Sequence, residues 1–149
     1  GLGLALSADF RIACPEARFG ANFAKLGFHP GFGSSVTLPR IIGKQKAMDM
    51  LFTARRVPGE EAYEMGLADK LTTKENLLKE AENFASEIVS SAPMAVESIR
   101  STLRGNLAEQ VEEIVDWELS EQVRLQKTQD FKDGIAASLT RETPKFNRK

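Results

Sequence analysis

The spacing of apolar residues changes along the chain, from short broken runs to long helical stripes. Residues 4–8 form a short apolar stretch behind a glycine turn, which suits a buried helix that ends at Asp9. Residues 10–14 and 17–20 alternate bulky with small or polar residues, which predicts two short strands. Between residues 27 and 33, three glycines and one proline predict a loop whose backbone turns sharply and approaches a neighbour closely.

Helices dominate the chain after this loop. Pro39 is expected to open a helical turn that Gly43 closes, and Thr128 is a plausible N-cap. Helical spacing predicts further helices over residues 44–54, 58–66, 77–88, 93–103 and 107–119, and after residue 128. In the last two, the apolar stripe runs in steps of four: Leu107, Val111, Val115 and Leu119, then Phe131, Ile135 and Leu139. Strands and turns followed by helices favour a layered α/β body.

Composition narrows the classes of partner. Of 149 residues, 42% are apolar and 28% charged, as in ordinary globular domains. Twenty basic and 21 acidic side chains nearly cancel, so we expect no nucleic-acid partner. One cysteine, Cys14, and one histidine, His29, exclude an internal disulfide and a Cys/His metal site. Both facts fit a reducing cytosol or organelle matrix, and we expect a cytoplasmic location. No apolar run is long enough to span a bilayer.

Three features could carry chemistry. Gly1-x-Gly3 before an apolar helix could stabilise negative charge, although glycines that merely allow close packing explain it equally. A dinucleotide fingerprint is excluded because Leu6 stands where its third glycine is required. His29, in the glycine-rich loop, could exchange protons near neutral pH, and a structural role stays open. Ser34 and Ser35 fit helix capping better than nucleophilic catalysis. The third feature is the basic tail, which could meet phosphates, although a solvated terminus is the favoured interpretation of its last two members; it comprises Arg141, Lys145, Arg148 and Lys149.

Several segments, in order and spacing, resemble the C-terminal part of the crotonase (enoyl-CoA hydratase/isomerase) superfamily. They are residues 1–9, the Leu26–Gly33 turn, residues 38–43, residues 62–69, residues 128–135 and the Pro144-Lys145-Phe146 end. The resemblance implies a ββα spiral core over residues 1–69 and a helical C-terminal region over residues 70–149. In this family that region serves oligomer contacts, so a homotrimer or homohexamer is expected. The chain begins in an apolar pattern without methionine, and we expect it to continue a longer polypeptide.

The same resemblance implies binding of acyl-CoA thioesters, with two backbone N–H groups that stabilise an enolate-like anion. One N–H aligns just before Gly1, so Gly1 and Leu2 would form the edge of the oxyanion hole. Leu26 would also contact substrate, and Arg141 matches a basic position that holds coenzyme A phosphates in relatives. Coenzyme A would enter as part of the substrate, and no separate cofactor or metal is expected.

The departures from the family pattern are equally informative. Hydratases carry glutamates at the positions of Gly3 and Phe23, and some isomerases carry an acid at the position of Gly31. Neither glycine nor phenylalanine can move a proton. With this resemblance, the sequence predicts an enoyl-CoA hydratase/isomerase-like enzyme that hydrates, isomerises or hydrolyses a thioester without these acids. His29, or residues upstream of this chain, would replace them as the acid–base group. A non-catalytic acyl-CoA-binding or assembly subunit is the alternative, as is a half-molecule that does nothing alone.

Overall fold

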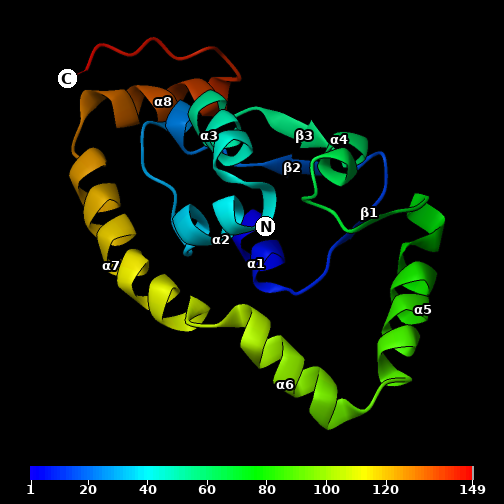
Figure 1. Ribbon diagram of the computed structural model, residues 1–149. Helices are drawn as coiled ribbons and strands as arrows, with labels where there is room; N and C mark the ends of the chain where they lie inside the picture. The colour runs from blue at the N-terminus through cyan, green and yellow to red at the C-terminus, as the bar shows by residue number, and fades with distance from the viewer. Residues whose placement is uncertain (149) are drawn as a thin grey trace.

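A computed structural model describes residues 1–148 as a small strand-and-helix core with helices arranged around it (Figure 1). Its elements are, in order, α1 (Leu2–Ser7), β1 (Ile12–Ala13), β2 (Arg18–Gly20), η1 (Ala24–Leu26), α2 (Ser34–Ile42), α3 (Lys44–Thr53), β3 (Arg56–Pro58), α4 (Gly59–Glu64), β4 (Lys70–Leu71), η2 (Lys74–Asn76), α5 (Leu77–Val89), α6 (Pro93–Arg104), α7 (Leu107–Leu125) and α8 (Gln129–Thr140). The predicted α/β class is confirmed. Helices α5, α6 and α7 form an arc that leads from the β1 side of the core to α8.

The core contains two small two-stranded sheets. Strand β1 pairs in parallel with β4, Ile12 opposite Lys70, and β2 pairs antiparallel with β3, Phe19 opposite Val57. The buried apolar cluster of the core draws all its members from residues 6–68, with Leu38, Met50, Val57 and Leu67 fully buried. The predicted boundary between the core and the helical C-terminal region lies after residue 69. This position falls between the last member of the apolar cluster, Ala68, and strand β4.

Helix α2 begins earlier than its sequence indicates. The prediction that Pro39 opens the helix is wrong, because Pro39 lies inside the helix as its sixth residue. Gly33 is the N-cap and offers no side chain, so Ser34 and Ser35 are not caps but the first helical residues. A carboxylate from α7, that of Glu118, accepts hydrogen bonds from the backbone N–H groups of Gly33 and Ser35 instead. The cap comes from a distant segment, and local signals therefore could not place this helix start.

The apolar stripes predicted on α7 and α8 are wrong at their C-terminal ends. Val115 and Leu119 are 38% and 57% exposed, and Leu139 is 81% exposed. A step of four residues turns about 40° further than one helical turn, so a stripe in steps of four winds off the packed face. The inner face of α7 is formed instead by Leu107, Val111, Ile114, Glu118, Gln122 and Leu125.

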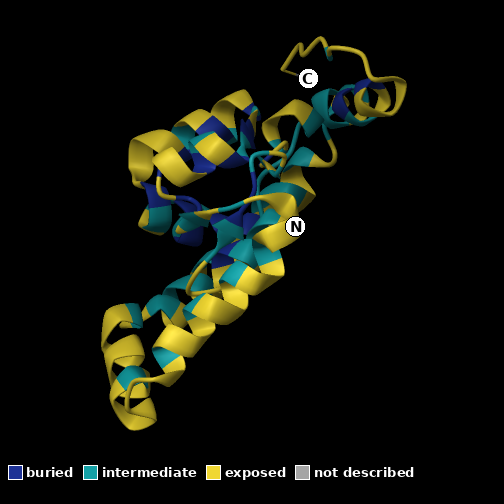
Figure 2. Cartoon of the chain, turned by 90° about the vertical axis from the view of Figure 1, so that its right-hand side faces the viewer, coloured by how far each residue is buried: buried dark blue, intermediate teal, exposed yellow. Residues whose placement is uncertain are grey.

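The arc touches the core at separate points rather than along its whole length. Phe84 of α5 packs edge-on against Phe10, with ring centroids 4.8 Å apart. The C-terminal half of α6 is held by polar contacts: Nε of Arg100 and Nε of Arg104 donate to Asp9, at 2.8 and 2.9 Å. Figure 2 shows exposed residues over much of the arc and buried residues in the core.

The contact at Asp9 has a pH signature. Burial raises the pKa of Asp9, but the hydrogen bonds and charges of Arg100 and Arg104 outweigh it, and the net pKa lies below its usual value. A carboxylate with a lowered folded-state pKa stabilises the fold above its unfolded pKa. That contribution is lost as the pH falls through the lowered pKa.

We expect Asp9→Asn to loosen the C-terminal half of α6. Because the pair is partly solvent-exposed, the loss of unfolding free energy should be about 1 kcal/mol or less at neutral pH. It should vanish at strongly acidic pH, where the parent carboxylate is also protonated. Urea unfolding and amide hydrogen exchange across α6 measure it, with Glu97→Gln, an exposed acid on the same helix, as control. Equal exchange in Asp9→Asn and parent would contradict the assignment.

Candidate functional site

A cleft of about 450 Å³ opens where α1, the turn after β2 and the loop before α2 meet. It is lined by Gly1, Leu2, Gly3, Leu4, Gly20, Asn22, Phe23, Gly31, Phe32 and Ser34. A neighbouring hollow of about 460 Å³ shares Gly1, Leu2, Gly20 and Asn22 with it. The fold thus brings Gly3, Phe23 and Gly31 to one cleft, although the first and the last are 28 positions apart in the sequence.

Two of the glycines that line this cleft, Gly3 and Gly31, face side chains that occupy the space beside them. A Cβ on Gly3 would lie 2.8 Å from Cδ1 of Phe32 and 2.9 Å from its Cβ. A Cβ on Gly31 would lie 2.5 Å from Nε2 of Gln122. A larger residue at either glycine therefore requires its neighbour to move.

Phe23 gives the cleft an apolar wall that is tied to the C-terminal helices. Its ring meets that of Phe28 edge-on at 5.5 Å, and Phe28 meets Phe131 of α8 edge-on at 5.6 Å. Such T-shaped contacts are the favoured geometry of aromatic pairs. The wall is thereby ordered, and it contains no proton donor or acceptor at residue 23.

The start of α1 forms another side of the cleft. Gly1 is the N-cap, and its carbonyl accepts the backbone N–H of Ala5 at 3.1 Å. The first N–H groups of a helix have no partner within the helix and carry a partial positive charge. Gly1 and Leu2, at this end of α1, both line the cleft, and their substrate-binding role stays a prediction.

The predicted acid–base residue, His29, is half-buried beneath α7 and is not among the residues that line the cleft. Its Nδ1 lies 2.8 Å from the carbonyl oxygen of Pro30. Because a carbonyl oxygen only accepts, Nδ1 carries the proton in the neutral ring and Nε2 is left as the acceptor. The hydrogen bond from Arg124 lowers the pKa of Glu121 on α7, and the charge of nearby His29 lowers it further.

The other two predicted substrate contacts lie outside this cleft. Leu26, at the end of η1, packs against α8, where a Cβ on Gly134 would lie 2.7 Å from its carbonyl carbon. Arg141 is exposed at the C-cap of α8, with a left-handed φ of 61°. The structure thus brings together Gly1, Leu2, Gly3, Phe23 and Gly31, and it places His29, Leu26 and Arg141 elsewhere.

Sequence reasoning missed three residues that shape the cleft: Phe32, which lines it, and Glu118 and Gln122 on α7. Gln122 Nε2 donates to the backbone oxygen of His29 at 3.1 Å. The available signal was Glu118 itself, because a true helical period places this acid on the inner face of α7.

A larger hollow, of about 530 Å³, lies between η1, the end of α7 and the C-terminal segment. Arg124 and Arg148 line it, but Arg124 is bound to Glu121 at 2.7 Å, and none of the predicted site residues is present there. We therefore favour the cleft at α1, where the predicted positions converge.

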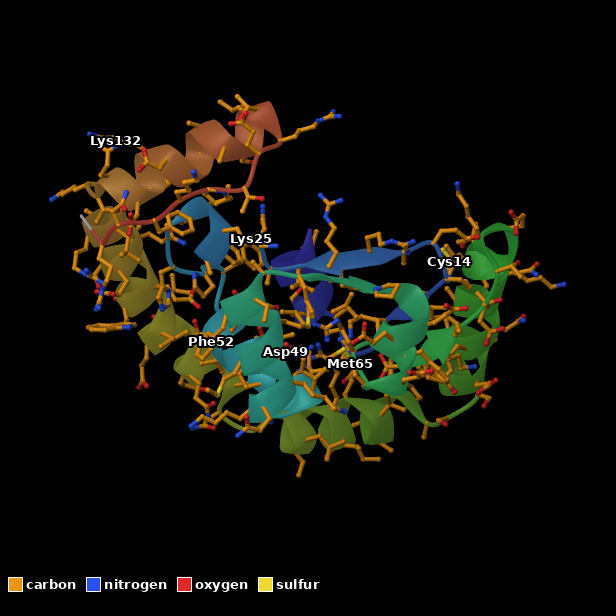
Figure 3. All side chains as sticks on the ribbon, turned by 90° about the horizontal axis from the view of Figure 1, so that it is seen from above. Cys14, Lys25, Asp49, Phe52, Met65 and Lys132 are labelled. Carbon is orange, nitrogen blue, oxygen red and sulfur yellow. The ribbon has the colours of Figure 1, made fainter. Side chains whose placement is uncertain are left out.

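Two kinds of site find no support in residues 1–148. No group of three or more His, Cys, Asp or Glu residues could hold a metal ion, and none of the helices has the length and apolar character needed to cross a membrane. Cys14 is a buried free thiol. It lies near α5, at the end of the molecule opposite α8, where Lys132 is found (Figure 3).

Sequence comparisons identify relatives of this chain. The chain is 33% identical over 146 residues to a crotonyl-CoA hydratase of Syntrophomonas wolfei, covering 98% of this chain and 56% of that protein. It is 33% identical over 137 residues to a short-chain-enoyl-CoA hydratase of Clostridium acetobutylicum, covering 92% and 52%. The chain therefore spans little more than half the length of these relatives.

Solved structures give the same result. An enoyl-CoA hydratase/isomerase from Pseudoalteromonas atlantica superposes with a TM-score of 0.88 at 28% identity, covering 99% of this chain and 59% of that one. An enoyl-CoA hydratase from Bacillus halodurans gives 0.82 at 31% identity, covering 91% and 55%. The profile of the enoyl-CoA hydratase/isomerase family matches residues 1–149. The chain, with its crotonase fold and its cleft at the start of α1, belongs to the enoyl-CoA hydratase/isomerase family.

Proposed function

We propose that the chain is part of an acyl-CoA-processing enzyme that stabilises a thioester enolate. The observation that carries this proposal is the convergence of Gly1, Leu2 and Gly3 with Phe23 and Gly31 on one cleft in a member of this family. Backbone N–H groups aimed at an oxygen that becomes anionic lower the barrier, because they need no rearrangement as the charge develops. Gly1 and Leu2 would contribute the edge of that oxyanion hole.

The reaction would not be hydration by two glutamates. The positions where the family resemblance expects acids hold Gly3, Phe23 and Gly31, and Phe32 and Gln122 occupy the space beside the two glycines. Three reactions therefore remain candidates: isomerisation, thioester hydrolysis, and hydration that uses another acid–base group. His29 lies outside the residues that line the cleft, but it is the candidate in this chain, acting through its Nε2.

The apolar character of the cleft also favours a second candidate, a non-catalytic subunit that binds acyl-CoA. Phe23 and Phe32 give it two aromatic walls where hydratases would need polar groups. Such walls suit an acyl chain but move no proton.

For partners we propose the acyl-CoA substrate, with coenzyme A as part of it and no separate cofactor, and further copies of the same protein in a trimer or hexamer. The arc exposes large apolar side chains, among them Val89, Met94 and Leu103, at 80%, 83% and 72%. Exposed apolar surface of this kind is typical of protein contacts. A cytoplasmic location agrees with the free thiol of Cys14.

The proposed function predicts turnover of at least one acyl-CoA thioester by the full-length protein. A panel of 2-enoyl-, 3-enoyl- and saturated acyl-CoA thioesters separates hydration, isomerisation and hydrolysis by product mass and free thiol release. Binding by calorimetry without turnover would favour the non-catalytic subunit. If the protein neither binds nor turns over any thioester of the panel, both the enzyme and the non-catalytic subunit are contradicted.

For His29 we expect His29→Ala to lower kcat about 100-fold and to leave KM nearly unchanged, because a general acid–base group acts in the chemical step. Lys25→Ala, which removes an exposed cation from neighbouring η1, should behave as the parent. Unchanged turnover by His29→Ala would remove His29 from the reaction.

For Arg141 we expect Arg141→Ala to weaken binding of coenzyme A thioesters about fivefold at low ionic strength. Since exposed charges are screened by salt, the difference should shrink as salt is added. Calorimetric titration at two salt concentrations measures it, with Arg141→Lys as the charge-preserving control. Equal affinity of Arg141→Ala and parent at low salt would contradict this role.

A further inference from the structure

Glu118 is a buried acid whose carboxylate is fully used in contacts with one turn. Its residue is 1% exposed. Oε2 accepts the backbone N–H of Gly33 at 2.8 Å, and Oε1 accepts that of Ser35 at 3.0 Å. A buried charge is rarely found without such partners, and here it also faces the positive end of α2. The carboxylate thus fixes the position of the turn that precedes α2.

That turn has an unusual backbone. Phe32 and Gly33 are both left-handed, with φ of 65° and 67°. Glycine adopts this conformation freely, whereas a phenylalanine seldom does and needs surrounding structure to hold it there. Val111 of α7 closes on the turn as well, because a Cβ on Gly33 would lie 2.8 Å from its Cγ1.

The strained residue lies at the cleft. Phe32 is 66% exposed, lines the cleft and stands against Gly3, where its ring and Cβ fill the space that a side chain would take. The room in this part of the cleft is therefore set by where the Phe32 ring stands. The ring, in turn, stands where Glu118 holds the backbone next to it.

We propose that Glu118 is a positioning residue that, through Phe32, limits the size of the acyl group the cleft accepts. This inference rests on the proposed function, since it assumes that an acyl thioester occupies the cleft. Without the anchor, the turn can leave the left-handed conformation and the ring can move off Gly3. Longer acyl chains then gain room, whereas short ones lose a packing surface.

The test is Glu118→Gln in the full-length protein, with butyryl-CoA and decanoyl-CoA as probes. An amide of the same shape keeps one acceptor but turns an NH₂ group toward a backbone N–H, so one hydrogen bond is lost. We expect amide exchange at Gly33 and Ser35 to rise about tenfold or more. The ratio of the two dissociation constants should shift about tenfold toward decanoyl-CoA. Phe32→Ala should produce the same shift, and the double variant should add little to it.

Glu121→Gln is the matched control, because that acid lies on the same helix but bonds Arg124. Unchanged selectivity in folded Glu118→Gln, or additive selectivity shifts in the double variant, would overturn the inference. If Glu118→Gln does not fold, Phe32→Ala decides alone, and unchanged selectivity there overturns it. If the parent binds neither probe, the proposed function fails and the acyl-size limit with it, while the exchange rates still report whether Glu118 holds the turn.

Discussion

The hydrogen bonds from the start of α2 to the carboxylate of Glu118 are the contact on which the rest of this structure depends. They join the helical arc to the core at the point where the loop of residues 27–33 ends. One turn further along α7, Gln122 holds the same loop at the carbonyl of His29. A buried carboxylate with both oxygens satisfied is stable in place and costly to move. Glu118 and Gln122 thus hold the loop beside the cleft from the same face of α7.

In the cleft, two glycines each lie against a larger side chain that fills the space beside them. Gly3 pairs with Phe32, and Gly31 pairs with Gln122, in each case a missing side chain with one that fills its space. An acid at Gly3 would collide with the Phe32 ring. A member of the enoyl-CoA hydratase/isomerase family with these pairs has a cleft shaped for apolar contact, and any proton transfer has to come from outside positions 3, 23 and 31.

The arc follows a different rule from the core. The core is a compact apolar cluster, but α6 is attached through Asp9, Arg100 and Arg104, and Arg40 caps it by donating to the carbonyl of Leu103 at 2.9 Å. Polar contacts at a surface define an orientation and contribute little free energy. The outer apolar residues of the arc remain exposed. Glu118 and Gln122 of α7 hold the arc to the loop beside the cleft.

The sequence by itself determined most helices and the α/β class, because helical periods, a glycine end such as Gly43, and the N-cap Thr128 are local signals. Its resemblance to the crotonase superfamily indicated the family. It also identified Gly3, Phe23 and Gly31, which the fold brings to one cleft. It did not determine the start of α2, the inner face of α7 or the roles of Phe32 and Glu118. Those were decided by the hydrogen bonds of Glu118 with Ser35 and Gly33, which lie 83 and 85 positions away from it in the sequence. Pairing over such a separation follows from tertiary packing and not from a local pattern.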